Sequence, residues 1–222
     1  MVNLFMRHIL ASESIYKKQL LSRVLNDFDQ ITPAIDETIF KSEQAPDAAV
    51  RLALNKGQII LESNPNSLII SSDQVAVADG RILQKPGSDI KAIDQLSYQS
   101  GKMVEFFTCV CVTKAAKSTG VIQSHKLSRT QAHFKTLTKE QIESYVLREQ
   151  SYNSTGAFKA EGFGIALFRK LSSDDPTSIL GLPLIDLVSI LSQFDIDVFL
   201  TTDLLELLNA FIYLTLLSPY GL

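Results

Sequence analysis

The chain has 222 residues, of which 45% are hydrophobic and 20% are charged, and its formal net charge is −3. This length and composition suit one compact domain or two close lobes, and they exclude disordered, collagen-like and disulfide-dependent classes. The slight acidic excess argues against a nucleic-acid partner, because proteins that bind duplexes usually carry a basic face.

The first predicted elements are a short buried strand at residues 9–11 and a helix that follows a polar turn, Ser12-Glu13-Ser14. N–H groups at the start of a helix lack partners within it, so this turn and Lys17 form a candidate phosphate site. An ordinary capped helix with exposed lysines is the simpler alternative. The apolar residues expected on the inner side of the helix are Leu20, Leu21, Val24 and Leu25.

The middle of the chain alternates between helical and strand-like patterns, which predicts an α/β fold. Asp79-Gly80 lies between two alternating runs and indicates a hairpin, while Ser88 and the Thr138/Gln141 pair have the character of helix N-caps. The pattern predicts helices at 45–61, 88–96 and 138–148 and strands at 68–71, 75–78, 103–113 and 121–135.

A glycine-containing loop at 154–164 carries Lys159 and Glu161 and leads to a predicted strand at 165–171. Its glycines allow close approach of the backbone to a ligand, but they equally suit tight turns. Gly181-Leu182-Pro183 precedes the last predicted helix, with Pro183 expected in the first turn.

The two ends of the chain and its cysteines bear on location. Arg7 and His8 interrupt the only early apolar stretch, so no signal peptide is predicted and a cytoplasmic location is expected. Cys109 and Cys111 share one face of a predicted strand without further Cys or His partners, which favours buried thiols over a zinc site.

The C-terminal residues 204–217 are almost wholly apolar. Glu206 and Asn209 interrupt them, and they fall short of the ~20 residues that a membrane-spanning helix needs. A packed helix or dimer contact is the preferred interpretation, and no membrane partner is expected. We predict a main domain over 1–200 and an apolar extension over 201–222.

Carboxylates and lysines interrupt the apolar elements in a combination that suits a triphosphate beside a metal ion. Asp36, Glu37 and Asp73 offer the oxygen ligands that Mg²⁺ and Mn²⁺ prefer, and one of them could instead deprotonate water. Lys56 and Lys85 could neutralise charge on phosphate oxygens. Solvated turns and surface lysines are the competing interpretations.

Taken in order, these motifs resemble the Maf family of nucleoside-triphosphate pyrophosphatases. Residues 10–21 are similar to the family's opening pattern L-A-S-x-S-P-x-R-R-x-x-L-L, and the resemblance extends over roughly residues 8–194. It implies a two-lobed fold with a central mixed twisted sheet, flanking helices and a cleft between the lobes, and a possible homodimer. The other matching segments are Asp36-Glu37-Thr38, Ser72-Asp73-Gln74, Gln84-Lys85-Pro86, 158–164 and 181–184.

The resemblance further implies hydrolysis of a nucleoside triphosphate to the monophosphate and pyrophosphate with Mg²⁺ or Mn²⁺, and a link to septum formation. Matched by position, Asp73 is the catalytic proton acceptor, Lys85 assists catalysis, and Glu37 joins Asp73 at the metal. The implied substrate-binding residues are Ser12, Tyr16, Lys17, Lys56, Gln74 and Glu161.

At Tyr16, Gln74 and Glu161 the chain resembles the subgroup of the family that acts on 7-methyl-GTP. Members acting on dTTP and UTP tend to have Asp-Thr where this chain has Asp73-Gln74, and Gln at the position of Glu161. N7-methylation makes guanine cationic, so Tyr16 could stack on the ring while Glu161 accepts hydrogen bonds from its N1–H and N2 amino edge.

The chain departs from the family at Ile15, which replaces a proline, and at Lys17 and Lys18, which replace paired arginines. Lysine keeps the charge but lacks the bidentate fork of arginine. Two alternatives therefore stand beside the 7-methyl-GTP interpretation: a pyrophosphatase of the dTTP/UTP type, and a catalytically weakened nucleotide-binding regulator of cell division.

Overall fold

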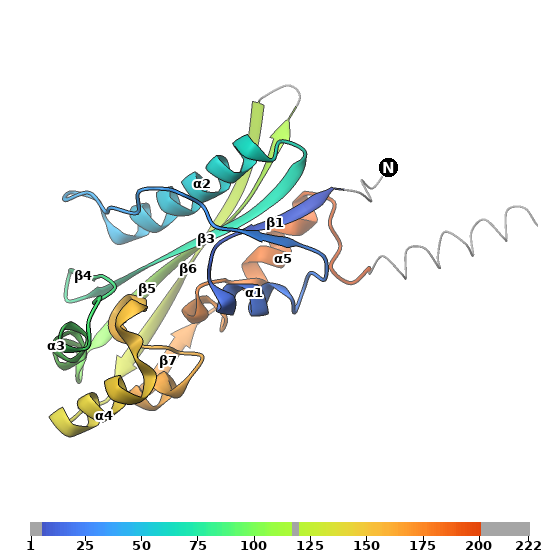
Figure 1. Cartoon of the computed structure of the whole chain (residues 1–222). Coiled ribbons are helices and arrows are strands. Elements are labelled where there is room, and N and C mark those ends of the chain that lie inside the picture. The colour runs from blue at the N-terminus through green and yellow to red at the C-terminus, as the bar shows by residue number, and fades with distance from the viewer. Residues whose placement is uncertain (1–5, 117–119, 201–222) are drawn as a thin grey trace, which may run out of the picture.

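The computed structural model describes residues 6–116 and 120–200. In this part of the chain a seven-stranded mixed sheet forms the centre of the molecule, in the order β2-β1-β3-β5-β6-β7, with β4 paired to β3 (Figure 1). β1 pairs in parallel with β2 and β3, and the remaining pairs are antiparallel. The strands are β1 (Arg7–Ala11), β2 (Asp29–Ile31), β3 (Ser67–Ala78), β4 (Arg81–Leu83), β5 (Met103–Ala116), β6 (Gly120–Phe134) and β7 (Phe168–Ser173).

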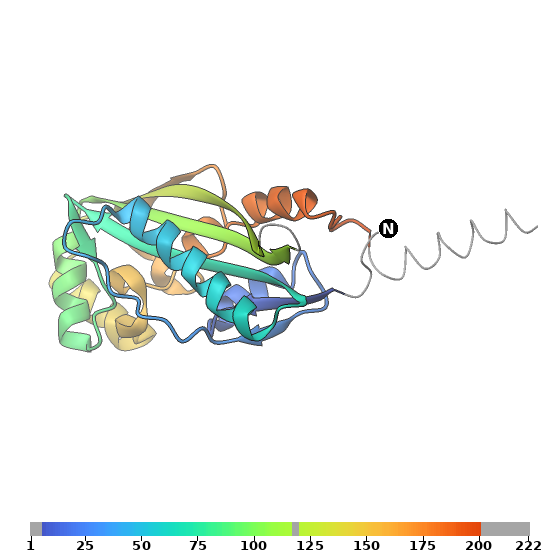
Figure 2. The ribbon, with the colours of Figure 1, turned by 90° about the horizontal axis from the view of Figure 1, so that it is seen from above.

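Helices cover both faces of the sheet (Figures 1 and 2). α2 packs on the face that carries Ile9 and Ile69, while α1 and α5 pack on the opposite face against Leu10 and Ile70. This arrangement follows from the alternation of side chains along a strand. The helices are α1 (Ile15–Leu21), α2 (Ala45–Ser63), α3 (Asp89–Gln99), α4 (Lys139–Glu149) and α5 (Leu184–Gln193), and the 3₁₀ turns are η1 (Ser151–Asn153), η2 (Thr155–Ala157), η3 (Phe163–Leu167) and η4 (Ser178–Leu180).

Separate apolar clusters divide the molecule into two lobes that share the long strands. One cluster joins α3 and α4 to the start of β5 and the end of β6 through Leu96, Tyr145, Phe106 and Phe134. Two others lie around α1, α5 and the end of α2, against β1 and the first half of β3 (Figure 1). The fourth joins the start of α2 to the middle of β3 and β5. The predicted mixed α/β architecture with flanking helices is therefore confirmed.

Strand β3 is open along one edge at its middle. Residues 67–71 of β3 pair with β1, and residues 76–78 pair with β4 on the same side. Among the described residues no strand pairs with 72–75 on that edge, while β5 covers the other edge throughout. Side chains from this short stretch are therefore free to line a cleft between the lobes.

Several local predictions are confirmed. Ser88 caps α3, and Thr138 and Gln141 form a reciprocal capping box at α4. Asp79 and Gly80 take positive φ angles of 47° and 75° in the β3–β4 hairpin, which matches the turn type that Asp-Gly favours. Cys109 and Cys111 are buried free thiols.

The boundaries of other elements differ from prediction. The first helix ends at Leu21, and the strand β2 was not predicted because it has only three residues. β3 is continuous through the polar stretch at 71–74, since both faces are covered there. Residues 165–167 belong to a 3₁₀ turn rather than a strand, and Pro183 is the N-cap of α5 rather than part of its first turn.

Among the described residues, none of the helices is both long enough and apolar enough to cross a bilayer. The predicted apolar extension at 201–222 lies outside the described residues.

Candidate functional site

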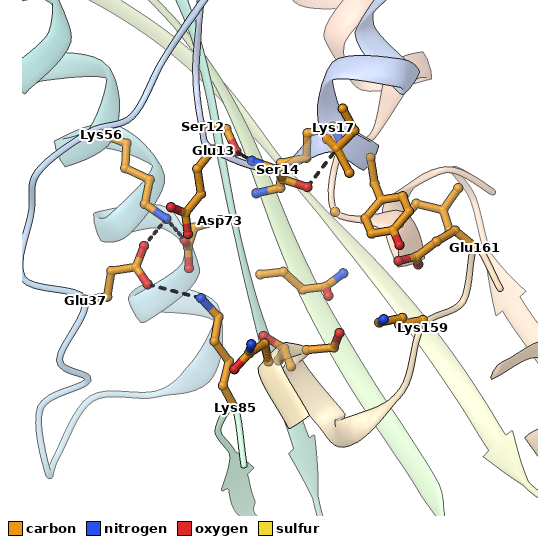
Figure 3. Close-up of a pocket in the computed structure, with 18 of the residues that line it drawn as sticks. Ser12, Glu13, Ser14, Lys17, Glu37, Lys56, Asp73, Lys85, Lys159 and Glu161 are labelled. Carbon is orange, nitrogen blue, oxygen red and sulfur yellow. Dashed lines mark hydrogen bonds and ion pairs between the residues drawn. The ribbon is translucent and has the colours of Figure 1, made fainter. Parts of the chain in front are cut away.

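A cleft of about 840 Å³ lies beside the open edge of β3, and residues from both lobes line it. All the site residues predicted from the sequence are part of its wall, and most of them are labelled in Figure 3. Lys56, Glu37 and Lys85 lie on one side of the view, and Lys159 and Glu161 lie on the other. The residues brought together are Ser12, Tyr16, Lys17, Glu37, Lys56, Asp73, Gln74, Lys85 and Glu161.

Successive side chains of β3 reach the cleft from opposite faces of the strand. Ser71 donates a 2.8 Å hydrogen bond to the carbonyl of Ala53 in α2, and Asp73 pairs with Lys56 of the same helix. Ser72 and Gln74 point the other way and bond to carbonyl groups of residues 178–181. Contacts from α2 therefore hold Asp73, and contacts from the η4 turn hold its neighbour Gln74.

Lys56 connects two carboxylates at one end of the site. Its ammonium nitrogen lies 2.5 Å from Glu37 Oε1 and also contacts Asp73 Oδ1 (Figure 3). Lys85 is more exposed and its nitrogen lies 3.8 Å from Glu37 Oε2. Gly57 lets α2 approach the sheet closely, because a Cβ there would lie 2.4 Å from Thr113 Oγ1. This close packing brings the neighbouring Lys56 to Asp73.

The charges in this cluster alter one another's protonation. Burial alone would lower the pKa of Lys56, but the charge of Asp73 and hydrogen bonds to Asp73 and Glu37 raise it above its usual value. Burial would likewise raise the pKa of Glu37, yet the hydrogen bond and charge of Lys56 hold it low. Both groups are therefore ionised at neutral pH.

Lys17 lies at the start of α1 and is partly buried. Its Nζ donates a 3.0 Å hydrogen bond to the carbonyl of Ser72, directly before Asp73. Burial and the nearby charge of Lys56 lower the pKa of Lys17 to about 8, although Asp73 and Glu37 oppose this effect. The ammonium group thus faces the same cluster from the opposite side of β3.

The turn before α1 is ordered by serine hydroxyls. Ser12 Oγ accepts a hydrogen bond from Ser14 N at 3.1 Å, and Ser14 Oγ accepts one from Lys17 N at 3.3 Å (Figure 3). Ser14 is therefore the N-cap of α1. Because α1 has only seven residues, an anion at this turn would meet the side chains of Ser12 and Lys17 rather than the dipole of a long helix.

Tyr16 and Glu161 lie near each other at the end of the cleft away from Lys56. Burial, assisted by the negative charge of Glu161, raises the pKa of Tyr16, and burial raises the pKa of Glu161 itself. The loop that carries Glu161 is fixed by Tyr145, whose hydroxyl accepts a 2.9 Å hydrogen bond from Lys159 N. Gly164 permits this loop to turn tightly, since a Cβ there would lie 2.3 Å from the Lys159 carbonyl oxygen.

Several residues that line or support the cleft were not identified as site residues from the sequence. Glu13 and Lys159 line the wall, although both belong to segments that the sequence marked. Thr108 and Ser178 support it from behind by contacts to Gln74. Gly181 is part of the wall, accepts a hydrogen bond from Ser72 and leaves room for Lys17. No motif could have identified Thr108, which sits inside an ordinary apolar strand.

Carboxylate oxygens are the donors that a hard divalent cation prefers, and Glu37 and Asp73 present theirs at one end of the cleft. In residues 6–116 and 120–200, no group of three or more His, Cys, Asp or Glu side chains is placed to hold a metal ion by itself. The residues present therefore fit a cation that shares two protein carboxylates with ligand oxygens. Three nearby lysines make the same end attractive to a polyanion.

Comparison with known proteins places these features in context. A family model described as Maf-like protein matches residues 7–194. The 7-methyl-GTP pyrophosphatase of Pseudoalteromonas atlantica is 42% identical over 196 residues, covering 87% of this chain and 98% of the relative. The proteins of the same name from Bordetella pertussis and Colwellia psychrerythraea are 42% and 40% identical, and cover 85% and 86% of this chain and 92% and 94% of their own lengths.

Among solved structures, a HAM1 protein from Coxiella burnetii aligns with 85% of this chain and 100% of its own, with a TM-score of 0.45 and 13% sequence identity.

Proposed function

This chain belongs to the Maf family, as its motifs predict, and from that premise we propose that it hydrolyses 7-methyl-GTP to 7-methyl-GMP and pyrophosphate. The observation that carries the proposal is a single cleft with lysines and carboxylates at one end and an aromatic ring beside a carboxylate at the other. The names of relatives at 40–42% identity over most of the chain support the same activity.

The phosphates occupy the end of the cleft that holds Lys17, Lys56 and Lys85. These ammonium groups offset the negative charge of the triphosphate and of the departing pyrophosphate. Ser12 adds a hydroxyl from the turn before α1. Lys17 is already held by the Ser72 carbonyl, so it is oriented before the substrate arrives.

Glu37 and Asp73 would hold a divalent cation, Mg²⁺ or Mn²⁺, together with phosphate oxygens. When bound, such an ion supplies Lewis-acid polarisation of the phosphoryl group that is attacked. Lys56 holds both carboxylates in place through its ion pairs, and its hydrogen bond and charge lower the pKa of Glu37.

Asp73 orients a water molecule and accepts its proton as the water oxygen attacks the α-phosphorus. The bond from the α-phosphorus to the bridging oxygen breaks, and pyrophosphate leaves with the bonding electron pair. The side chain of Asp73 is largely buried, and the strand and α2 fix its position. A general base so placed contributes roughly 10²- to 10⁴-fold to a rate.

The base lies at the other end of the cleft. N7-methylation gives guanine a positive charge, which favours stacking on Tyr16 and proximity to the carboxylate of Glu161. When ionised, Glu161 offers only acceptors, and it then complements the N1–H and N2 amino donors of guanine. The pyrimidine bases of dTTP and UTP, the substrates of the alternative, carry no such positive charge.

The test is pyrophosphate release from 7-methyl-GTP by the wild type and by Asp73→Asn. We expect the variant to lose at least 100-fold in kcat, because the amide cannot accept the proton of the water. Asp79→Asn is the matched control, since Asp79 lies six residues along in the β3–β4 hairpin, outside the cleft. Robust turnover by Asp73→Asn would remove Asp73 from the mechanism.

A substrate panel tests the base. 7-Methyl-GTP should exceed GTP, dTTP and UTP in kcat/KM, and Glu161→Gln should reduce its advantage over GTP, because the negative charge facing the cationic ring is lost. A wild type that prefers dTTP or UTP would contradict the proposed substrate and support the pyrimidine alternative.

A further inference from the structure

The carboxamide of Gln74 is tied to the protein by its nitrogen. Nε2 lies 2.9 Å from Thr108 Oγ1, 2.9 Å from the carbonyl of Ser178 and 3.4 Å from the carbonyl of Ile179. A primary amide has two N–H donors, so these acceptors use both of them. Gln74 nevertheless lines the cleft, and its Oε1 has no hydrogen-bond partner among the described residues.

The surroundings exclude the reversed amide. Thr108 donates its own hydroxyl hydrogen to the Ser178 carbonyl at 3.0 Å, so its oxygen can only accept from Gln74. A rotated carboxamide would place Oε1 against the Ser178 carbonyl and against a hydroxyl whose hydrogen is already used. The direction of the Gln74 amide is therefore decided by its partners.

Those partners are rigid. Thr108 and Ser178 are both fully buried. The hydroxyl of Ser178 contacts Thr130 Oγ1 at 2.5 Å and Ser173 Oγ at 3.0 Å, and its N–H donates to the Asp175 carbonyl at 3.1 Å. The Ser178 carbonyl consequently cannot turn away when a ligand enters.

We propose that Thr108 and the Ser178 carbonyl fix Gln74 so that it offers the base only a hydrogen-bond acceptor, which makes Thr108 a positioning residue for base selection. The inference rests on the proposed function and adds a second base-reading group to it. Gln74 Oε1 and the Glu161 carboxylate together present acceptors to the cleft and no donor. Such a site selects a base with adjacent N–H donors, as on the N1–H and 2-amino edge of guanine, and disfavours bases that present acceptors there.

The experiment compares kcat/KM for 7-methyl-GTP and 7-methyl-ITP, which differ only in the 2-amino group. We expect the wild type to prefer 7-methyl-GTP by about tenfold or more, as for one lost hydrogen bond. Thr108→Val keeps the shape of the side chain but removes the hydroxyl, and the preference should fall to about threefold or less. Thr108→Ser restores the hydroxyl and should restore the preference.

A double-mutant cycle separates positioning from general damage. Gln74→Ala should lower the preference at least as far as Thr108→Val does, leaving only the part that Glu161 supplies, and adding Thr108→Val to it should change the preference no further. Thr108→Ala serves as a second variant if valine prevents folding. A wild type that does not distinguish the two nucleotides, a Thr108→Val variant with the wild-type preference, or an equal effect of Thr108→Val without Gln74 would each overturn the inference.

The two proposals can fail separately. If the wild type releases no pyrophosphate from any nucleotide, the proposed function fails, and the same cycle is measured as Kd for the two nucleotides by calorimetry. If hydrolysis is robust but Thr108→Val lowers kcat/KM for both nucleotides in parallel, the enzyme stands and the role given to Thr108 is wrong.

Discussion

Gly181 leaves room for Lys17: a Cβ at position 181 would lie 3.0 Å from Lys17 Cε, and the backbone there has a φ of +93°. Gly181→Ala should therefore displace the ammonium group that we propose binds the phosphates. We expect kcat/KM for 7-methyl-GTP to fall by about tenfold or more, since small displacements of positioning groups are costly. Steady-state kinetics measure this loss.

Gly80→Ala is the matched control for that substitution. Gly80 has a similar φ of +75°, but a Cβ there meets no atom within 4 Å, and the residue lies in the hairpin outside the cleft. Both variants should lose about 1 kcal/mol of unfolding free energy from backbone strain. Equal kinetic effects in the two variants would contradict a specific contact between Gly181 and Lys17.

The protonation of Lys17 should limit activity at alkaline pH. With a pKa of about 8, Lys17 is charged below that pH and becomes neutral above it. We expect kcat/KM to fall by about tenfold per pH unit above 8, as the charged fraction falls. Lys17→Arg keeps its charge throughout this range, so its profile should lack this descending limb; an unchanged limb would exclude Lys17 as its source.

The same variant separates an enzyme from a weakened regulator. At pH 7 about nine-tenths of Lys17 is charged, so the protonation effect alone gives arginine less than about a twofold advantage. A comparable rate in the wild type and Lys17→Arg supports a competent enzyme. A gain of about 100-fold would favour the alternative of a nucleotide-binding regulator with weakened catalysis.

Glu37→Gln should weaken binding of the divalent cation and leave recognition of the base unchanged. We expect the Mg²⁺ concentration for half-maximal activity to rise by about tenfold, because a carboxylate ligand is lost. Asp36→Asn is the control: Asp36 lines the same cleft, but its Oδ1 accepts a 2.9 Å hydrogen bond from Thr38 N in the turn. A metal titration in which both variants behave alike would argue against Glu37 as a ligand.

Asp175→Asn should destabilise the fold. The buried carboxylate accepts hydrogen bonds from Thr177 N at 2.9 Å and Ile185 N at 2.8 Å, joining the η4 turn to the start of α5. An asparagine amide would turn its N–H donor toward one of these backbone N–H groups. Urea unfolding should therefore show a free energy of unfolding lower by about 2–4 kcal/mol. Asp174→Asn, at an exposed position, should stay within about 0.5 kcal/mol of the wild type. Equal losses would show that the buried hydrogen bonds are not the cause.

Motifs predicted the wall of the cleft better than its supports. Asp73, Lys85 and Glu161 stand in segments whose composition marks them, and the structure places all of them on one cavity. Thr108 and Ser178 act through a hydroxyl buried in a strand and a backbone carbonyl. Such contacts depend on how distant segments pack, and no local pattern encodes them.

Secondary structure was likewise predicted best where it depends on neighbouring residues. Caps and the Asp-Gly hairpin depend on neighbouring residues and were predicted well. The apolar residues at 165–167 suggested a strand, but Gly164 donates to the Lys159 carbonyl at 3.1 Å and the chain continues as a 3₁₀ turn. Packing of that loop against α4 decided the conformation.

The alternation along β3 has a consequence for how new specificities arise. Asp73 is braced by α2, whereas its neighbour Gln74 is braced by the η4 turn. With the roles proposed for these two residues, substitutions that alter the contacts of Thr108 and Ser178 to Gln74 would change base selection without touching the α2 contacts of Asp73. A protein with this fold could then change the nucleobase that it selects with few substitutions, because base selection and phosphate cleavage would depend on contacts from different elements.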